Sequence, residues 1–192
     1  KEMLEWPAWA AYQEEIAKRT PPAPPDVPAV SPVEALEGGV EALNADVETQ
    51  LRRRLQEASP EFFERAVIDL LWAMGFGGSH GEKKHIGKSG DDGVDGVISQ
   101  DALGLRKLGI QAKRYKDGNN VGAGQIRDFY GGLHAGGADR GVFITTSQFT
   151  DAARDTADAF NGVIVLIDGI RLTSLMLRYG VAVQAGETLT IY

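Results

Sequence analysis

Short apolar blocks recur along the second half of the chain, separated by polar and glycine-rich stretches. Short continuous apolar runs predict buried strands, whereas apolar residues spaced by three and four predict helices. The expected strands cover residues 94–98, 108–113, 142–144 and 163–167, with short additions at 181–183 and 188–191. The expected helices begin near residue 124 and cover residues 150–160 and 169–179. Strands that alternate with helices in this way are typical of an α/β fold with a mixed sheet.

A longer helical pattern precedes these blocks. Between residues 33 and 58, apolar residues recur at spacings of three and four, namely Leu36, Val40, Leu43, Val47, Leu51 and Leu55. This spacing predicts an amphipathic helix, whose start is weakened by Gly38 and Gly39 because glycine disfavours a helix interior. Its apolar face has two interpretations that stay open, namely packing against its own domain and dimerisation.

The next helix has a well-marked start. Ser59 can cap a helix, Pro60 suits the first helical position, and Glu61 suits the positive end of the helix dipole. Its expected buried face consists of Phe63, Val67, Leu70, Leu71 and Met74. Gly75 or Gly77 is expected to end the helix. Glu64 lies within one turn of the start, where a lone glutamate is by default a surface residue.

The amino-terminal region contains a proline-rich segment. Six of the eight prolines lie within residues 21–32, which therefore form neither a regular helix nor a central strand and are expected to act as a semi-rigid linker. Residues 1–20 are expected to form a helical segment with Trp6, Trp9 and Tyr12 on a shared side. The predicted organisation is thus a helical segment at 1–20, a linker at 21–32, an amphipathic helix at 33–58 and the main domain at 59–192.

Composition restricts the class of protein. The 192 residues, 43% of them hydrophobic, are enough to bury the core of one domain. The absence of cysteine excludes disulfides and thiolate metal sites, and no apolar run is long enough to span a membrane, so we expect a cytoplasmic protein. The net charge is −7, but residues 83–116 hold 8 basic and 4 acidic side chains. The basic side chains of this segment are expected to contact DNA phosphates. A solvated basic loop would have the same composition.

The candidate chemistry lies in the same segment. Asp95 interrupts an apolar run, and a buried carboxylate needs a cation or hydrogen-bond donors as partners. On the next expected strand, Gln111 and Lys113 project from one face, while Ile110 and Ala112 project from the other. If the two strands are adjacent, an aspartate, an amide and an ammonium meet at one place.

Such a group of ligands suits a hard divalent cation. Mg²⁺ prefers carboxylate and carbonyl oxygens, so Asp95, the Gln111 side chain and the Ala112 main-chain carbonyl are the expected ligands. Lys113 would face the open side and help water to attack a phosphodiester. The alternative interpretation is structural: an aspartate at a strand end often caps a turn, and Gln-x-Lys often belongs to a solvated edge.

Five blocks of the sequence resemble the catalytic domain of the Mrr-type restriction endonucleases, a branch of the PD-(D/E)xK nuclease superfamily. The blocks are SPEFFERAVIDLLWAMGF at 59–76, GKSGDDGVDGVI at 87–98, GLRKLGIQAKRY at 104–115, GVFITTSQFT at 141–150 and VLIDGIRLTSLM at 165–176. Their agreement in order makes the resemblance more specific than any three residues. It implies a restriction-endonuclease-like α/β/α sandwich with a central mixed sheet, preceded by an N-terminal helical segment.

The resemblance also implies roles for individual residues. Asp95 matches the family's metal-binding aspartate, Lys113 its catalytic lysine, and Glu64 the acidic residue of the preceding helix. Gln111 stands where most of the superfamily has Asp or Glu, which is a known variant in this branch. The site then carries one negative charge fewer, so we expect it to hold Mg²⁺, or Mn²⁺ in its place, more weakly.

The activity implied by the resemblance is metal-dependent hydrolysis of double-stranded DNA, with restriction of methylated DNA as the task. A homodimer or higher homo-oligomer is expected, because cutting both strands requires two active sites. The alternatives are a repair or junction nuclease and a DNA-binding module with weak or no catalysis. The resemblance further implies that a winged-helix DNA-recognition domain precedes this stretch, and Lys1 is not an initiator methionine, so we expect a piece of a longer protein.

Further polar residues are secondary candidates. Possible DNA contacts are Lys88, Arg114, Lys116 and Gln125, the last on the first turn of a helix whose N–H groups attract anions. Each is by default a solvated side chain. The hydroxyls of Thr145, Thr146 and Ser147 either cap or bind phosphate. His80 and His85 are expected to be loop residues, with contact to the DNA backbone as the alternative. Asp91 and Asp92 are expected to form a turn, with Asp91 a weaker candidate for orienting the site.

Overall fold

The computed structural model describes residues 7–18, 31–77, 82–85, 94–101 and 103–184. Contacts between residues divide the chain into two compact units, Lys1–Gly39 and Val40–Tyr192. Helix α1 (Pro7–Lys18) belongs to the first unit, and helix α2 (Pro32–Glu57) begins there and ends in the second. The remaining helices are α3 (Pro60–Ala73), α4 (Ala123–Ala135), α5 (Asp151–Ala159) and α6 (Gly169–Arg178).

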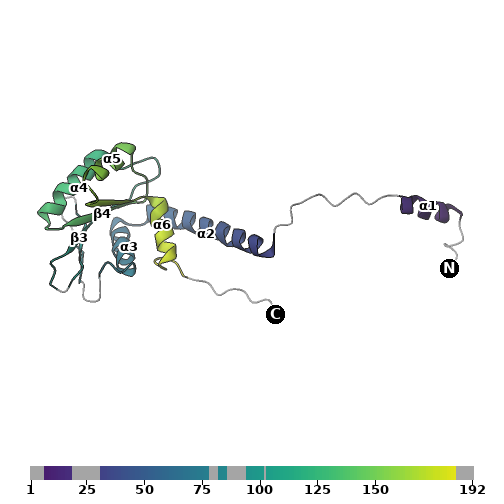
Figure 1. Ribbon diagram of the computed structural model, residues 1–192, viewed down its shortest axis with the longest axis horizontal. Helices are drawn as coiled ribbons and strands as arrows, with labels where there is room; N and C mark the ends of the chain where they lie inside the picture. The colour runs from purple at the N-terminus through teal and green to yellow at the C-terminus, as the bar shows by residue number, and fades with distance from the viewer. Residues whose placement is uncertain (1–6, 19–30, 78–81, 86–93, 102, 185–192) are drawn as a thin grey trace. The chain divides into compact units, whose positions relative to one another are not determined.

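A five-stranded mixed sheet forms the centre of the second unit (Figure 1). Its strands are β1 (Glu82–His85), β2 (Gly96–Ser99), β3 (Lys107–Lys113), β4 (Arg140–Thr145) and β5 (Ile164–Ile167). They lie side by side in sequence order. The pairs β1–β2 and β2–β3 are antiparallel, whereas β3–β4 and β4–β5 are parallel. The predicted mixed sheet is therefore confirmed.

Each face of the sheet has its own apolar core, as the alternation of side chains along β3 and β4 requires. On one face, Ile110 and Ala112 pack with the buried residues of α3 and α6 and with Leu51 and Leu55 of α2. On the other face, Phe143 packs with the buried residues of α4 and α5. Helices thus cover both faces, which confirms the α/β/α sandwich (Figure 1).

Helix α3 begins and ends where its sequence signals predict. The side chain of Ser59 accepts a hydrogen bond from the backbone N–H of Phe62 at 3.2 Å, which satisfies one of the donors at the helix start. At the other end Gly75 has φ +90°, a conformation that glycine adopts without steric cost. Both ends of the helix are therefore fixed by local signals in the sequence.

Two expectations about the secondary structure were wrong. Residues 82–85 form the edge strand β1, although His85 was expected to lie in a loop; this strand contains no apolar residue, so hydrophobic patterning does not reveal it. Residues 181–183 are not a strand, because Val181 donates its N–H to the carbonyl of Met176 and closes the end of α6. The strand expected at 188–191 and the residues His80, Asp91 and Asp92 lie outside the described residues. In the part of the chain that is described, no helix is long and apolar enough to cross a membrane.

Candidate active site

The centre of the site is the contact between Asp95 and strand β3. The antiparallel register places Gly96 opposite Ile110, and the N–H of Asp95 donates to the Ile110 carbonyl at 2.8 Å. The carboxylate Oδ2 of Asp95 accepts two hydrogen bonds, from the backbone N–H of Ala112 at 2.7 Å and from Nε2 of Gln111 at 2.6 Å. The structure therefore brings Asp95 and Gln111 together, as the sequence predicted.

The amide of Gln111 is oriented by this contact. Its side chain is only 1% exposed, and its nitrogen faces Asp95. Its oxygen, Oε1, is buried and has no hydrogen-bond partner among the described residues. A buried acceptor without a donor is costly, and coordination of a cation is one way to satisfy it.

The donor set fits a hard cation. A half-buried carboxylate and an unpaired amide oxygen are ligand types that Mg²⁺ accepts in proteins. No group of three His, Cys, Asp or Glu side chains that could hold a metal lies within the described ranges. The site would thus depend on an amide and a main-chain carbonyl in addition to its aspartate, as expected for a Gln-x-Lys variant.

Lys113 lies two residues beyond Gln111, and strand alternation places both side chains on the same face. The side chain is half-buried, and its ammonium makes no hydrogen bond or ion pair with any other described residue. Its carbonyl is held by the hydroxyl of Thr145 at 2.8 Å and by the N–H of Thr146 at 3.3 Å. The backbone of Lys113 is therefore fixed, while no residue in the described part of the chain pairs with its ammonium.

The hydroxyls that follow β4 hold the loop after Lys113 in place. Thr146 Oγ1 donates to the Tyr115 carbonyl at 2.7 Å and accepts from the Tyr115 N–H at 2.9 Å, and Ser147 Oγ contacts Asn120 Oδ1 at 3.2 Å. Thr145 and Thr146 are fully buried. Of the two roles foreseen for these residues, the structure shows backbone capping.

Gln125 connects helix α4 to this loop. Its Oε1 accepts from the N–H of Gly122 at 3.1 Å, and its Nε2 donates to the hydroxyl of Tyr115 at 2.8 Å. Both ends of the amide are occupied within the protein, so the side chain positions the start of α4 relative to β3. Tyr115 was not foreseen as part of the site, because its partners are 10 and 31 residues away along the chain.

Glu64 lies half-buried on α3, the helix whose core residues pack with Ile110 and Ala112. Strand alternation therefore places Glu64 on a helix that covers the opposite face of the sheet from the Gln111 side chain. Glu64 makes an interaction within the protein. Its role at the metal site stays a prediction.

The other candidate DNA contacts differ in how free they are. Arg114 donates from Nη1 to the carbonyl of Gln56 at 2.7 Å, so it connects β3 to α2 and is not a free surface cation. Lys116 is exposed and lines a cleft of about 490 Å³ together with Arg52 and Arg53 of α2. Lys88 lies outside the described residues. The two α2 arginines were missed because they are separated from Lys116 by more than sixty positions of sequence.

This fold, with an aspartate beside one strand and Gln-x-Lys on the next, is that of a restriction-endonuclease-like domain. Residues 55–176 match the family of Mrr catalytic domains, described as restriction endonuclease. The chain belongs to this family. It is also 43% identical over 155 residues to the type IV methyl-directed restriction enzyme EcoKMrr of Escherichia coli (strain K12), a match that covers 81% of this chain.

The chain spans about half the length of EcoKMrr, 50% of that protein. Two solved structures share the fold. The restriction endonuclease MspJI in complex with a 27-mer oligonucleotide superposes with a TM-score of 0.55 and 22% identity, covering 72% of this chain and 32% of MspJI. The DNA modification-dependent restriction endonuclease AspBHI superposes with a TM-score of 0.57 and 19% identity, covering 73% of this chain and 36% of AspBHI.

Proposed function

We propose that this domain hydrolyses phosphodiester bonds of double-stranded DNA in a reaction that requires a divalent cation, and that it acts on methylated DNA. The observation that carries the proposal is the buried Oε1 of Gln111, which lies beside the Asp95 carboxylate and has no donor among the residues that the structure describes. Family membership supports the nuclease class. The methyl-directed enzyme EcoKMrr supports methylated DNA as the substrate.

The residues that would hold the cation are Asp95 through its carboxylate, Gln111 through Oε1 and Ala112 through its main-chain carbonyl. Mg²⁺ is the expected ion, and Mn²⁺ would substitute, because both accept oxygen ligands. When bound, the cation supplies Lewis-acid stabilisation of the charge that develops on the phosphate. Glu64 remains a predicted member of this group, although its helix covers the face of the sheet opposite to the Gln111 side chain.

The protein itself would position the attacking water and the Lys113 ammonium beside the phosphate that is cleaved. Water attacks the phosphorus and loses a proton to the surrounding solvent, the bond from phosphorus to the leaving oxygen breaks, and that oxygen takes up a proton from solvent. Lys113, whose ammonium is unpaired within the described residues, would orient the water and stabilise charge on a phosphate oxygen. Its fixed backbone sets the point on β3 from which the flexible side chain reaches the phosphate.

DNA would approach the side of the domain where β3 ends. Exposed basic side chains there include Arg53 and Lys116. Because the whole chain is acidic, with a net charge of −7, we expect modest affinity that falls steeply with salt. Self-association into a homodimer would bring two sites to one duplex, as cutting both strands requires.

The test is digestion of a plasmid in the presence of Mg²⁺ or Mn²⁺, with EDTA as the control. Cleavage is expected for the wild type and expected to be lost in Asp95→Ala and Lys113→Ala, while circular dichroism shows an unchanged fold. Equal cutting by these variants would reject the assignment of the site. Retained DNA binding without any cleavage by the wild type would instead indicate a binding module of the same fold.

The substrate is tested separately. Cleavage rates are compared on methylated and unmethylated forms of one plasmid. The enzyme used is a longer protein that contains this domain and has about the length of EcoKMrr. Faster cutting of the methylated form is expected. Equal rates on both forms would favour the alternative tasks of repair or junction cleavage.

A further inference from the structure

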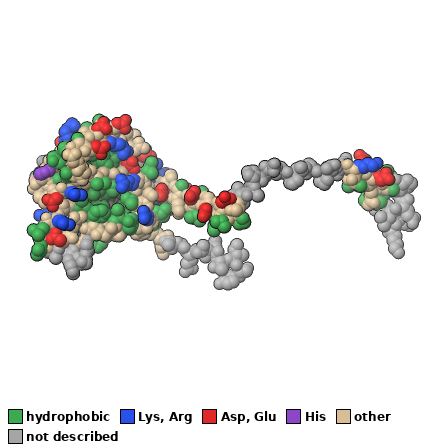
Figure 2. All heavy atoms as spheres, in the orientation of Figure 1, with side chains coloured by type: hydrophobic (Ala, Val, Ile, Leu, Met, Phe, Trp, Pro, Cys, Tyr) green, Lys and Arg blue, Asp and Glu red, His purple; other side chains and the backbone are tan. Residues whose placement is uncertain are grey.

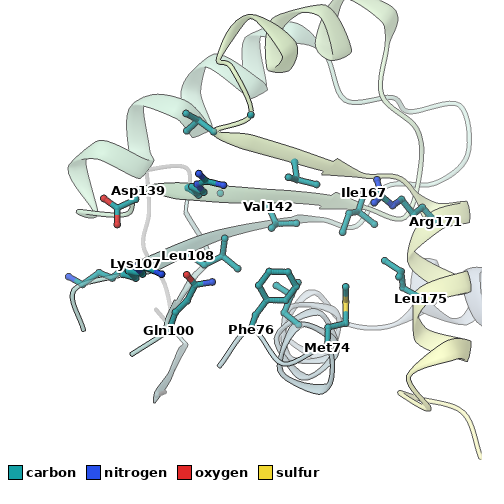
Figure 3. A pocket seen from close by; sticks show the side chains of 17 residues that line it. Met74, Phe76, Gln100, Lys107, Leu108, Asp139, Val142, Ile167, Arg171 and Leu175 are labelled. Atoms are coloured by element: carbon teal, nitrogen blue, oxygen red, sulfur yellow. The ribbon is translucent and has the colours of Figure 1, made fainter. Parts of the chain in front are cut away.

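A groove lies between α3, α6 and the sheet, at the end of β3 opposite to Gln111 and Lys113 (Figure 3). Its volume is about 640 Å³. The floor is apolar and consists of Leu71, Met74, Leu108, Val142, Val165 and Ile167. Val165 is 44% exposed although it lies on a strand of the sheet. The helices on this face therefore leave part of the apolar sheet surface uncovered.

The rim of the groove is basic. The described residues that line it include the cations Arg106, Lys107, Arg140 and Arg171 and one carboxylate, Asp139, which gives four positive charges against one negative. Figure 2 shows hydrophobic side chains on this face with basic side chains around them. A ligand that fits this surface must be apolar along its centre and acidic at its sides.

A surface of that kind is present on the first part of α2. Val33, Leu36, Val40 and Leu43 follow one another at spacings of three, four and three, and are 63%, 69%, 50% and 62% exposed. The same part of the helix carries Glu34, Glu37, Glu41, Asp46 and Glu48, and no Lys or Arg occurs between residues 32 and 51. Acidic and hydrophobic side chains are visible on α2 in Figure 2. The first part of α2 therefore presents a stripe of apolar side chains together with acidic side chains.

We propose that residues 33–47 of α2 dock into the groove of a second copy of this chain. Val40 and Leu43 belong to the same compact unit as the groove and remain exposed there, so they do not fill the groove of their own copy. The charges are complementary, with four acidic residues within residues 33–47 of the helix and a net charge of +3 on the groove. Pairing of residues 33–47 from two copies with each other would instead place eight carboxylates together without a Lys or Arg.

Each copy has one helix and one groove, so reciprocal docking closes a two-fold dimer. An amphipathic helix in an apolar groove is a recurrent mode of recognition. This inference deepens the self-association proposed above and uses neither the metal site nor cleavage. Its failure would leave the nuclease proposal untouched, and the reverse also holds.

The absence of native cysteine allows a direct test in the intact chain. Leu43→Cys and Val165→Cys proteins are mixed at about 10 μM, joined with a short thiol cross-linker and separated on a gel. Cross-linked heterodimer is expected at about a hundredfold higher yield than in the control mixture of Leu43→Cys with Asp155→Cys, because a docked pair has an effective concentration in the millimolar range. Asp155 is the matched control, since it is exposed on α5, a helix that covers the other face of the sheet.

Three outcomes would overturn the proposal. The first is a yield no higher than that of the control. The second is efficient cross-linking of Leu43→Cys to itself, which would indicate pairing of two α2 helices. The third is a monomeric, internally cross-linked product from the chain that carries both cysteines, which would indicate docking within one copy.

Charge reversal provides an independent measurement. Glu37→Lys with Glu41→Lys, or Arg106→Glu with Arg140→Glu, should each weaken the dimer at least tenfold in sedimentation equilibrium, because like charges then face each other. Combining all four substitutions should restore most of the association. Equal weakening without restoration would overturn the proposed pairing, and thermal melts of each variant show that the fold is intact.

Discussion

Replacement of Gln111 by Glu tests the metal site without measuring cleavage. The substitution changes little in size, but it converts the amide nitrogen that donates to Asp95 Oδ2 at 2.6 Å into a second carboxylate oxygen. The side chain at this position is only 1% exposed, so water offers little relief. In the metal-free protein, two carboxylates would therefore face each other in a poorly solvated place.

The cost can be worked out from the structure. Two unit charges about 4 Å apart repel by about 4 kcal/mol at an effective dielectric constant of about 20. Loss of a hydrogen bond to a charged group costs a further 1.5–3 kcal/mol or so. Because Asp95 is only half-buried, movement of its side chain toward solvent recovers part of this. We expect the free energy of unfolding in EDTA to fall by about 2–4 kcal/mol, at the upper end of the effects of single substitutions.

Addition of Mg²⁺ should narrow or remove the difference in stability between the two proteins. A second carboxylate strengthens the hold on a divalent cation, and a ligand present at 100 times its Kd adds about 2.7 kcal/mol of stability. The assay is urea unfolding followed by circular dichroism, in EDTA and in excess Mg²⁺. Gln111→Glu should gain at least 2 kcal/mol more from Mg²⁺ than the wild type does.

The matched control is Gln148→Glu, the same chemical change at an exposed position. It should alter the unfolding free energy by less than about 0.5 kcal/mol in either buffer. Two results would refute the reasoning. Equal stability of Gln111→Glu and the wild type in EDTA would mean that the two carboxylates do not interact, and no gain from Mg²⁺ in the variant would mean that these oxygens do not hold the ion.

Substitutions at three further positions test the scaffold by urea unfolding. Ser59→Ala removes the hydroxyl that accepts from the Phe62 N–H and should cost about 1 kcal/mol, whereas Ser59→Asp should restore it. Gly169→Ala places a Cβ against the Thr146 carbonyl and should cost about 1–3 kcal/mol; a neutral effect would show that the backbone yields. Hydrogen bonds from the backbone N–H groups of Arg106 and Leu105 lower the pKa of Asp101, so its advantage over Asp101→Asn is full above about pH 5 and disappears as the pH falls through its folded pKa. A gap that widens in acid would contradict this account.

Most helices and strands were predictable from sequence, because the spacing of apolar residues records which side of an element is buried. The cap at Ser59 and the glycine at 75 marked the bounds of α3 for the same local reason. Strand β1 was missed, since Glu82–His85 is stabilised by pairing with β2 and carries no apolar residue. Residues 181–183 were assigned a strand because alternating apolar residues look alike in a strand and at the close of a helix.

At the candidate site, the residue types and their spacing predicted that Asp95 and Gln111 lie close together. Only the fold shows how they meet, because the direction of the Gln111 amide depends on the register of β2 against β3. The contacts of Tyr115 with Gln125 and Thr146 have no sequence signal, since they join segments that come together through the parallel pairing of β3 with β4.

The sequence by itself therefore determined the class of fold and the type of site. Periodic apolar residues predicted the helices and strands, and an aspartate followed by Gln-x-Lys predicted the site. The tertiary structure decided which polar groups are left without partners and which apolar surfaces stay uncovered. The Gln111 oxygen, unpaired within the described ranges, and the basic groove beside Val165 are both of this kind. The physical reason is that both features depend on contacts between residues that are far apart in sequence. These contacts exist only once the sheet and its helices have assembled.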